Sequence, residues 1–345
     1  MLYTNYLERY SNFFTYAKAN LKSVYSTKHE VVMPDSGETS VDIARASWVD
    51  KPGVILGGGL IILKPKDIIF PGFLAYSLTY GKNHKDIASK AQGKSVVHIH
   101  SKDLANLKFF FPKNIVTQRK ICNLLEEVNT YISLQQRKAK QLKLLKKAML
   151  QDLFTDKNVP KLRFNGFDAN WIQCKLEKEA LLTMGQSPSG STYSDQPSTY
   201  ILVQGNADLK NGWVKPRIWT TQITKLAKKG DIIITVRAPA GKVGRTNFDV
   251  VLGRGVASIQ GNDFIFYLLS KMDMNKYWKK YAAGSTFESI NSNDIKNTRV
   301  HVPNLPEQNR IANLFLRLDD LIRFQQNKLN NLQKTKQFLL QNMFI

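Results

Sequence analysis

Apolar residues recur at spacings of three and four along two long segments of the chain, residues 118–154 and 308–344. Neither segment contains glycine or proline, and prolines stand just upstream of both, where a helix start tolerates them. The pattern predicts two amphipathic helices. At 1.5 Å per residue, each would be roughly 55 Å long.

The two segments are copies of one sequence. Gln118 aligns with Gln308 and Phe154 with Phe344, without a gap, at an offset of 190 residues. A long helix with one apolar stripe needs a partner, and the other copy is the simplest one, in a coiled coil. The alternative is that each helix packs only on its own globular domain.

Polar residues are also retained between the copies, although helix pairing requires only the apolar stripe to match. This retention predicts a second surface that is used twice, by two copies of one partner. The residues expected to form the helix pair or this partner surface are Gln118, Ile121, Leu124, Ile132, Gln135, Gln136 and Leu142 in the first copy and Gln308, Ile311, Leu314, Ile322, Gln325, Gln326 and Leu332 in the second.

A weaker repeat precedes each helix, because Gly93, Ile99 and Asp103 match Gly284, Ile290 and Asp294 at an offset of 191. Short β-branched runs, expected as strands, occupy residues 60–63, 68–70 and 231–236, and short helices are expected at 73–80 and 263–271. We therefore predict an α/β (α+β) fold with a pseudo-twofold internal repeat. Its globular domains span residues 1–112 and 158–303, and its helical regions span 113–157 and 304–345.

Charge changes this picture more than any other bulk property. The 345 residues include 50 Lys and Arg against 27 Asp and Glu, a formal net charge of +23. Such an excess favours a polyanionic partner. Nucleic acid is the favoured partner, although a ribosomal or anionic-membrane protein could show the same charge balance. The first residues lack a signal-peptide core, and no apolar run approaches the roughly 20 residues that span a bilayer. We expect a soluble, cytoplasmic protein.

No enzymatic motif is evident in the sequence. Cys122 and Cys174 stand far apart without a metal-ligand spacing, so we expect reduced thiols and no metal site. Gly57-Gly58-Gly59 lacks the frame of a phosphate-binding loop, and there is no nucleophile elbow or adenine-methyltransferase motif. A stand-alone nuclease or methyltransferase, and a coiled-coil adaptor without a DNA role, remain the alternative functions.

Reading DNA requires donors and acceptors at base edges, and Lys, Arg or backbone N–H groups at phosphates. The candidates are Ser36, Gly37, Glu38, Thr39, Lys94, Ser95, His98 and His100 in the first head and Arg237, Lys242, Arg245, Arg254, Lys279, Lys280, Ser285 and Thr286 in the second. For each, phosphate contact or a solvated surface charge is the alternative to base contact. Lys279 and Lys280 adjoin Tyr277, Trp278 and Tyr281, which suits a backbone-tracking patch or, equally, an amphipathic helix that buries its aromatic residues.

The duplicated arrangement resembles the specificity subunit of type I restriction-modification systems. Residues 302–311, VPNLPEQNRI, are similar to that family's usual entry into a conserved helix, as are residues 318–322, LDDLI. Residues 36–39 and 92–98 resemble one class of target recognition domain, and residues 230–231 and 236–244 with Gly284, Ser285 and Thr286 resemble another. The resemblance covers nearly the whole chain.

The resemblance implies a non-catalytic subunit with two target recognition domains, each reading one half of a split double-stranded DNA site. It implies that antiparallel helices hold these domains apart and dock two modification (methyltransferase) subunits, which restriction subunits later join. S-adenosylmethionine, ATP and Mg²⁺ would belong to those partners, and this chain would bind no cofactor. The second head begins with Lys161-Leu162-Arg163-Phe164, for which the first head has no counterpart, so we expect the first domain to be N-terminally incomplete.

Overall fold

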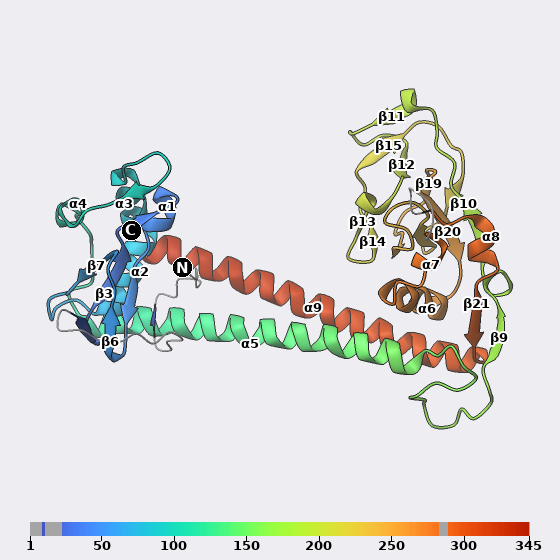
Figure 1. Ribbon diagram of the computed structural model, residues 1–345, viewed down its shortest axis with the longest axis horizontal. Coiled ribbons are helices and arrows are strands. Elements are labelled where there is room, and N and C mark those ends of the chain that lie inside the picture. Colours follow the sequence, from blue (N-terminus) through green and yellow to red (C-terminus); the bar gives the residue numbers. More distant parts are fainter. Residues whose placement is uncertain (1–8, 11–22, 283–288, 345) are drawn as a thin grey trace. The chain divides into compact units, whose positions relative to one another are not determined.

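The structure is a computed structural model that describes residues 9–10, 23–282 and 289–344. The chain divides into two compact units. The first unit is Met1–Lys138 with Gln325–Ile345, and the second is Ala139–Phe324. Each unit therefore combines one globular head with parts of both long helices (Figure 1).

The two long helices are α5 (Ile115–Leu153) and α9 (Leu305–Met343), each of 39 residues. Both lie where the repeated apolar spacing predicts them. Pro306 is in the first turn of α9, where its missing N–H costs nothing. Among the described residues, no helix is long and apolar enough to cross a membrane.

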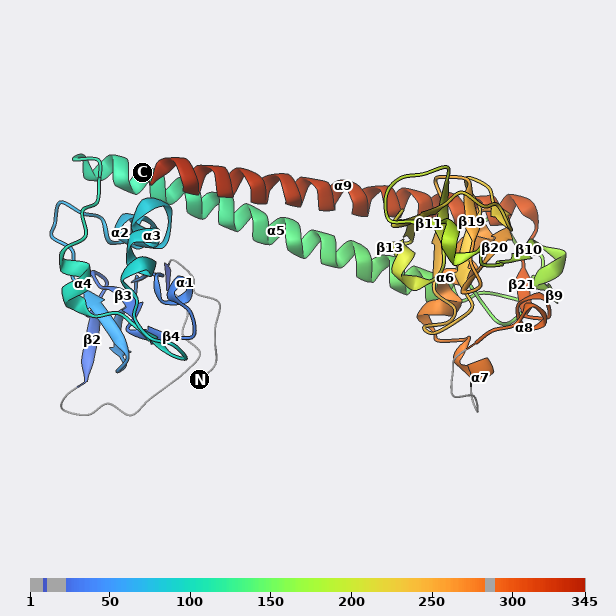
Figure 2. The ribbon, with the colours of Figure 1, turned by 90° about the horizontal axis from the view of Figure 1, so that it is seen from above.

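The first head is a small sheet covered by short helices (Figure 2). Among its described residues, the main sheet has the order β1-β5-β3-β7, and β3 runs antiparallel to both β5 and β7. β2 pairs with β6 and β4 with β8. The elements are β1 (Arg9–Tyr10), β2 (Val24–Thr27), β3 (Val31–Pro34), β4 (Ser36–Gly37), α1 (Ser40–Ile43), β5 (Ser47–Val49), β6 (Pro52–Leu56), β7 (Leu60–Leu63), α2 (Pro71–Thr79), α3 (Gly81–Lys90), β8 (Val97–His98) and α4 (Ser101–Ala105).

The second head is larger and carries two main sheets, with strand orders β10-β20-β17-β18-β14-β13 and β11-β15-β12-β19-β16 among the described residues. β9 pairs with β21 beside them. The strands are β9 (Ile172–Lys175), β10 (Leu181–Met184), β11 (Tyr193–Ser194), β12 (Tyr200–Val203), β13 (Leu209–Lys210), β14 (Trp213–Val214), β15 (Ile218–Thr220), β16 (Leu226–Ala227), β17 (Ile232–Thr235), β18 (Val243–Arg245), β19 (Val250–Leu252), β20 (Val256–Gln260) and β21 (Arg299–Val302). The helices are α6 (Asp263–Met274), α7 (Lys279–Ala282) and α8 (Ser292–Lys296).

The two heads share one core plan. The order β7-β3-β5-β1 corresponds to β20-β17-β18-β14, with antiparallel pairing between the first three strands and parallel pairing between the last two in both heads. α2 corresponds to α6, because α2 is the first helix after β7 and α6 is the first helix after β20. The mixed helix and sheet content agrees with the predicted α/β class.

The phenylalanine after each long helix docks into a head. In the second unit, Phe154 packs against Phe264 of α6 and Phe315 of α9, with ring centroids 5.0 and 5.8 Å away. In the first unit, the repeat-related Phe344 packs on Phe73 of α2 at 5.4 Å. Both docked phenylalanines are buried, so each core includes the end of one long helix and the beginning of the other.

Gln118 and its repeat mate Gln308 are buried inside the units, contrary to their prediction as an outward partner surface. Gln118 is fully buried; it accepts a hydrogen bond from the Phe70 N–H and donates to the carbonyls of Ile68 and Pro112. Gln308 likewise donates to Pro303 and accepts from Asn262, the N-cap of α6. Both side chains tie the start of a long helix to the start of the head helix.

Other retained polar residues contact the opposite long helix within one unit. In the first unit, Gln325 is buried and its amide donates to the side chain of Gln135, its own repeat mate. In the second unit, Lys146 forms an ion pair with Asp319. Gln136 is exposed and Gln326 bonds Asn330 one turn along its own helix, so both side chains face away from these contacts.

Two expectations from the apolar pattern are wrong. Leu124 is 42% exposed, because the apolar stripe of α5 is centred on Leu125, which is fully buried. Residues 68–70 form a turn and not a strand, because Pro71 begins α2 and Phe70 is its N-cap. Ile132 and Ile311 are buried as expected, and the other expected stripe residues, Ile121, Leu142, Leu314, Ile322 and Leu332, are half-buried.

We predict that Leu125→Ala lowers the free energy of unfolding by about 2–5 kcal/mol, because it leaves a cavity in a packed core. Leu124→Ala is the matched control, and its cost should be below about 1 kcal/mol because the side chain is largely exposed. Urea denaturation followed by circular dichroism measures both. Equal losses for the two variants would contradict the assigned stripe.

Candidate nucleic-acid interface

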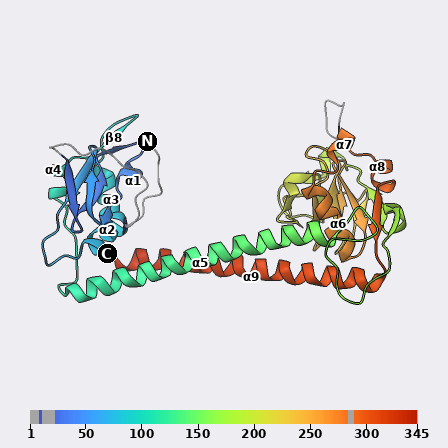
Figure 3. The same cartoon turned by 60° about the horizontal axis from the view of Figure 1, so that its bottom comes forward.

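In the first head, strand pairing joins the two candidate loops that the sequence separates by some sixty residues. Ser36 pairs with His98 and Gly37 with Val97, in the two-stranded ladder of β4 and β8. Thr39 follows as the N-cap of α1 and accepts from the Asp42 N–H. Figure 3 shows β8 and α1 at the same end of this head.

The second of these loops is a closed hairpin tip. Gln92 and His98 exchange two backbone hydrogen bonds, of 3.0 and 2.8 Å, which leave Lys94 and Ser95 exposed between them. His98 and His100 are exposed whereas Ile99 is buried, so both imidazoles lie on the solvent side, as the alternation predicts. Gly93 has φ +140°, and a Cβ there would lie 2.0 Å from the Val96 carbonyl oxygen.

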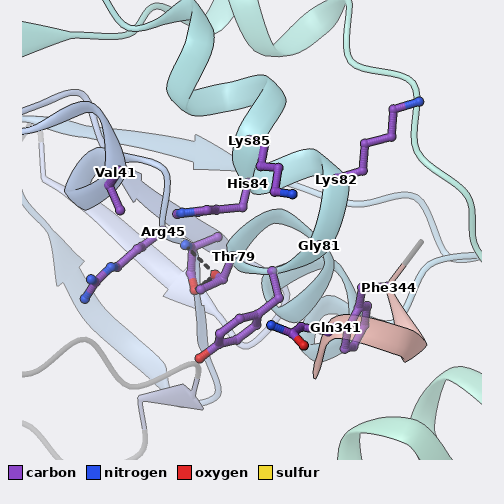
Figure 4. A pocket seen from close by; sticks show the side chains of 11 residues that line it. Val41, Arg45, Thr79, Gly81, Lys82, His84, Lys85, Gln341 and Phe344 are labelled. Carbon is purple, nitrogen blue, oxygen red and sulfur yellow. Dashed lines mark hydrogen bonds between the residues drawn. The ribbon is translucent and has the colours of Figure 1, made fainter. Parts of the chain in front are cut away.

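A basic cavity of about 770 Å³ lies next to α1 in the first unit (Figure 4). Four of its lining residues carry basic side chains: Arg45, Lys82, His84 and Lys85. Arg45 also lies 3.5 Å from Asp42, and the His84 Nδ1 lies 2.6 Å from the Ala44 carbonyl oxygen. Sequence reasoning missed this cluster, whose signal was the basic run around Gly81.

The second head places two candidate arginines side by side. The Val236 N–H donates to the Gly255 carbonyl, which brings the strand end before Arg237 to the turn that contains Arg254. Both arginines are exposed, and among the described residues neither has a carboxylate within ion-pair distance. Arg237 also bridges to Ser289, as Ser36 bridges to His98, so the two heads present candidate residues at equivalent positions.

Two other candidates in the second head are engaged within the protein. Arg245 is 13% exposed, its guanidinium pairs with Asp263, and its Cζ lies 4.2 Å from the Phe266 ring centroid. It is therefore a structural residue and not a free DNA contact, which corrects the prediction. Lys242 pairs with Asp273 at 2.8 Å and stays partly exposed.

The structure favours the second interpretation of the basic–aromatic segment around Lys279 and Lys280, in which the aromatic side chains are buried. Trp278 is 2% exposed and packs against Tyr277 and Tyr281, so its aromatic side chain belongs to the head core. Lys279 is exposed, and the Lys280 ammonium lies 3.6 Å from the Tyr277 ring centroid. Ser285 and Thr286 lie outside the described residues.

Sequence reasoning also missed two polar residues beside Arg254. The Arg254 N–H donates to the Ser187 hydroxyl at 3.1 Å, and Gly253 and Gly255 pack closely on Gln204. A Cβ on Gly255 would lie 2.0 Å from the Gln204 carbonyl oxygen, so only glycine permits this approach. The turn-forming run Gly185-Gln186-Ser187-Pro188 was the available signal.

Neither cysteine is a reactive thiol. Burial, with the Glu126 carboxylate beside it, raises the pKa of Cys122 to about 12. Burial and Glu179 raise the pKa of Cys174 to about 11. Both values suppress the thiolate that nucleophilic or metal chemistry requires. Among the residues that the structure describes, no group of His, Cys, Asp and Glu could hold a metal ion.

Comparison with known proteins decides the family. A family model for the type I restriction modification DNA specificity domain matches residues 183–334. The type I restriction enzyme MjaX specificity subunit of Methanocaldococcus jannaschii is 30% identical over 313 residues, which cover 86% of this chain and 72% of that protein. This chain belongs to the type I specificity subunits. The MjaVIII specificity subunit of the same organism is 21% identical over 94% of this chain and 80% of its own length.

Solved structures share the fold of this specificity subunit. The HsdS subunit from Thermoanaerobacter tengcongensis covers 93% of this chain and 82% of its own, at 23% identity and a TM-score of 0.55. The type I S subunit from M. genitalium gives a TM-score of 0.59 at 15% identity, and it covers 93% of this chain and 84% of its own. As a type I specificity subunit, the chain is a non-catalytic component for DNA specificity.

We predict that Arg245→Ala lowers the free energy of unfolding by about 1–3 kcal/mol, because it removes a buried cation and leaves Asp263 without its partner. Arg237→Ala should change it by less than about 0.5 kcal/mol, because that side chain is exposed. Urea denaturation followed by tryptophan fluorescence distinguishes the two. If Arg245→Ala left the free energy of unfolding unchanged, the assignment of Arg245 as a structural residue would be wrong.

Proposed function

We propose that this specificity subunit reads a bipartite double-stranded DNA target, with one half-site at each head. The observation that carries the proposal is the equivalence of the two candidate surfaces. In the first head, Ser36 follows β3 and pairs with His98, which precedes α4. In the second head, Arg237 follows β17 and bridges to Ser289, which precedes α8. Side chains at these positions suit base edges and phosphates.

The charge distribution also supports DNA binding by the two heads. The net charge of +23 favours a polyanion, and the exposed Arg237 and Arg254 and the basic cavity beside α1 supply cations near the candidate loops of their own heads. Neutralising phosphates releases counterions, so binding should weaken steeply with salt. The chemistry of the two heads differs, which suits two different half-site sequences.

The long helices complete the proposal. Paired antiparallel, α5 and α9 would set the separation of the half-sites and offer docking surfaces to two methyltransferase subunits, with restriction subunits joining through these. The exposed Gln136 remains available for such docking, whereas Gln118 and Gln308 are already used inside the units. S-adenosylmethionine, ATP and Mg²⁺ would be bound by the partner subunits, in the cytoplasm where the DNA is.

A methylome tests the function directly. We expect that co-expression of this chain with a cognate methyltransferase subunit, in a methylation-free host, yields methylated adenines in a split motif with a fixed spacer. A complete specificity subunit serves as the positive control for methyltransferase activity. Absence of a new motif beside a positive control would contradict the proposal, and a motif with one specific half would restrict DNA reading to one head.

Arg237→Ala and Arg254→Ala should each weaken duplex binding by about 1–3 kcal/mol, or reduce the salt slope by about one if the contact is to a phosphate. Arg299→Ala is the matched control, since Arg299 is exposed on β21 of the same head. Fluorescence anisotropy across a salt series measures both quantities. Equal effects of all three substitutions would indicate non-specific attraction and exclude a local reading surface.

A further inference from the structure

Residues 253–255 form a turn at which four strands of the second head end. β12 and β19 are parallel neighbours, so their carboxyl ends lie together, and the Gly253 N–H donates to the Val203 carbonyl at 2.7 Å. β10 and β17 both run antiparallel to β20 and end where β20 begins, directly after this turn. Polar residues follow each of the four strands: Gln186 and Ser187 after β10, Gln204 after β12, Arg237 after β17 and Arg254 after β19.

Gln204 lies directly beside Arg254. A Cβ on Gly253 would lie 3.1 Å from the Gln204 Cγ, and a Cβ on Gly255 would clash with the Gln204 carbonyl oxygen. Gln204 therefore contacts both residues that flank Arg254. Gln204 is half-buried and Arg254 is exposed, so the glutamine stands at the border between the core and the surface that carries the arginine.

The buried carboxylate of Asp208 fixes the backbone at Gln204. Asp208 is 2% exposed and accepts from the Gln204 N–H at 2.7 Å, the Gly205 N–H at 3.2 Å and the Arg217 Nε at 3.1 Å. The Gln204 side-chain amide, by contrast, has no hydrogen-bond partner in the part of the chain that the structure describes. A free amide on a fixed backbone is prepared for a ligand, because little conformational entropy is lost when it binds.

We infer that Gln204 is a specificity-determining residue, which reads one adenine in the half-site of the second head. A glutamine amide offers a donor and an acceptor in one plane, and adenine presents the matching N7 acceptor and N6 donor in the major groove. The neighbouring Arg254 supplies donors for a guanine or a phosphate beside that adenine. The inference rests on the proposed function and adds to it the residue and the base that are read.

The first head forms the same turn with a different side chain. The Asp35 N–H donates to the Gly59 carbonyl at 3.0 Å, which is the counterpart of the bond between the end of β17 and the Gly255 carbonyl. One residue earlier, Gly58 stands at the position of Arg254. The backbone of the turn is thus common to both heads, whereas the side chain that it presents is not. This difference suits a surface that selects a different base in each head.

Selection of DNA duplexes from a random library tests the inference, with the full chain co-purified with a cognate methyltransferase subunit. For the unaltered chain we expect a split motif with one adenine preferred by about tenfold or more in one half-site. Gln204→Ala should lower that preference to below about twofold and leave the other half-site unchanged. Gln204→Glu should move the preference to cytosine, because a carboxylate accepts from the cytosine N4 amine.

Gln260→Ala is the matched control, since Gln260 is an exposed glutamine at the opposite end of β20, and it should leave the motif unchanged. An undiminished adenine preference with Gln204→Ala would overturn the inference and leave the proposed function intact. Loss of selectivity at both half-sites with Gln204→Ala and with Gln204→Glu would make Gln204 a structural residue, and would also overturn the inference. Absence of any split motif with the unaltered chain would overturn the proposed function as well.

Discussion

Burial of one phenylalanine at the end of each long helix is the interaction on which both units depend. Phe154 and Phe344 each enter a head core at the point where a head helix meets the other long helix. Deleting a ring buried in this way costs about 3–5 kcal/mol, which is much of a domain's stability. The rings attract without direction, so polar bonds must fix the register. Gln118 and Gln308 do this, because each bonds backbone or capping groups at a head helix start.

Both units have a hydrogen bond between a head-helix tyrosine and a long-helix side chain at the same place, but that side chain is charged in one unit and neutral in the other. In the second unit the Tyr267 hydroxyl donates to Asp319, which also pairs with Lys146. In the first unit the amide of Asn129, the mate of Asp319, donates to the hydroxyl of Tyr76, the mate of Tyr267. Burial, with the neighbouring Asp319 carboxylate, raises the pKa of Tyr267 above its usual range, so the phenol remains a donor. A neutral amide fills the same place without an ion pair, which shows that position, and not charge, is what the packing requires.

The repeat, the helices and the mixed fold follow from the sequence because periodicity and self-similarity are properties of position along the chain. Side-chain roles depend on contacts between distant elements. Leu124 and Leu125 both satisfy a spacing of three or four, and only packing against the head selects Leu125. Retention of Gln118 in both copies fits an outer surface and a buried bond equally well. The role of Arg245 depends on β18 lying beside α6, which no local pattern shows.

The features that the two heads share belong to the buried frame, and the features that differ lie at the candidate DNA-reading surface. The strand order, the docked phenylalanine and the buried glutamine recur, whereas the residues at the equivalent strand junction change from the half-buried Ser36 and exposed His98 to the exposed Arg237 and Ser289. Under the proposed function, two half-sites of different sequence require different donors and acceptors on a common frame. A frame held by buried apolar and amide groups tolerates such exchange, because exposed loop residues contribute little to folding. The chain can therefore change what it reads without changing how it folds.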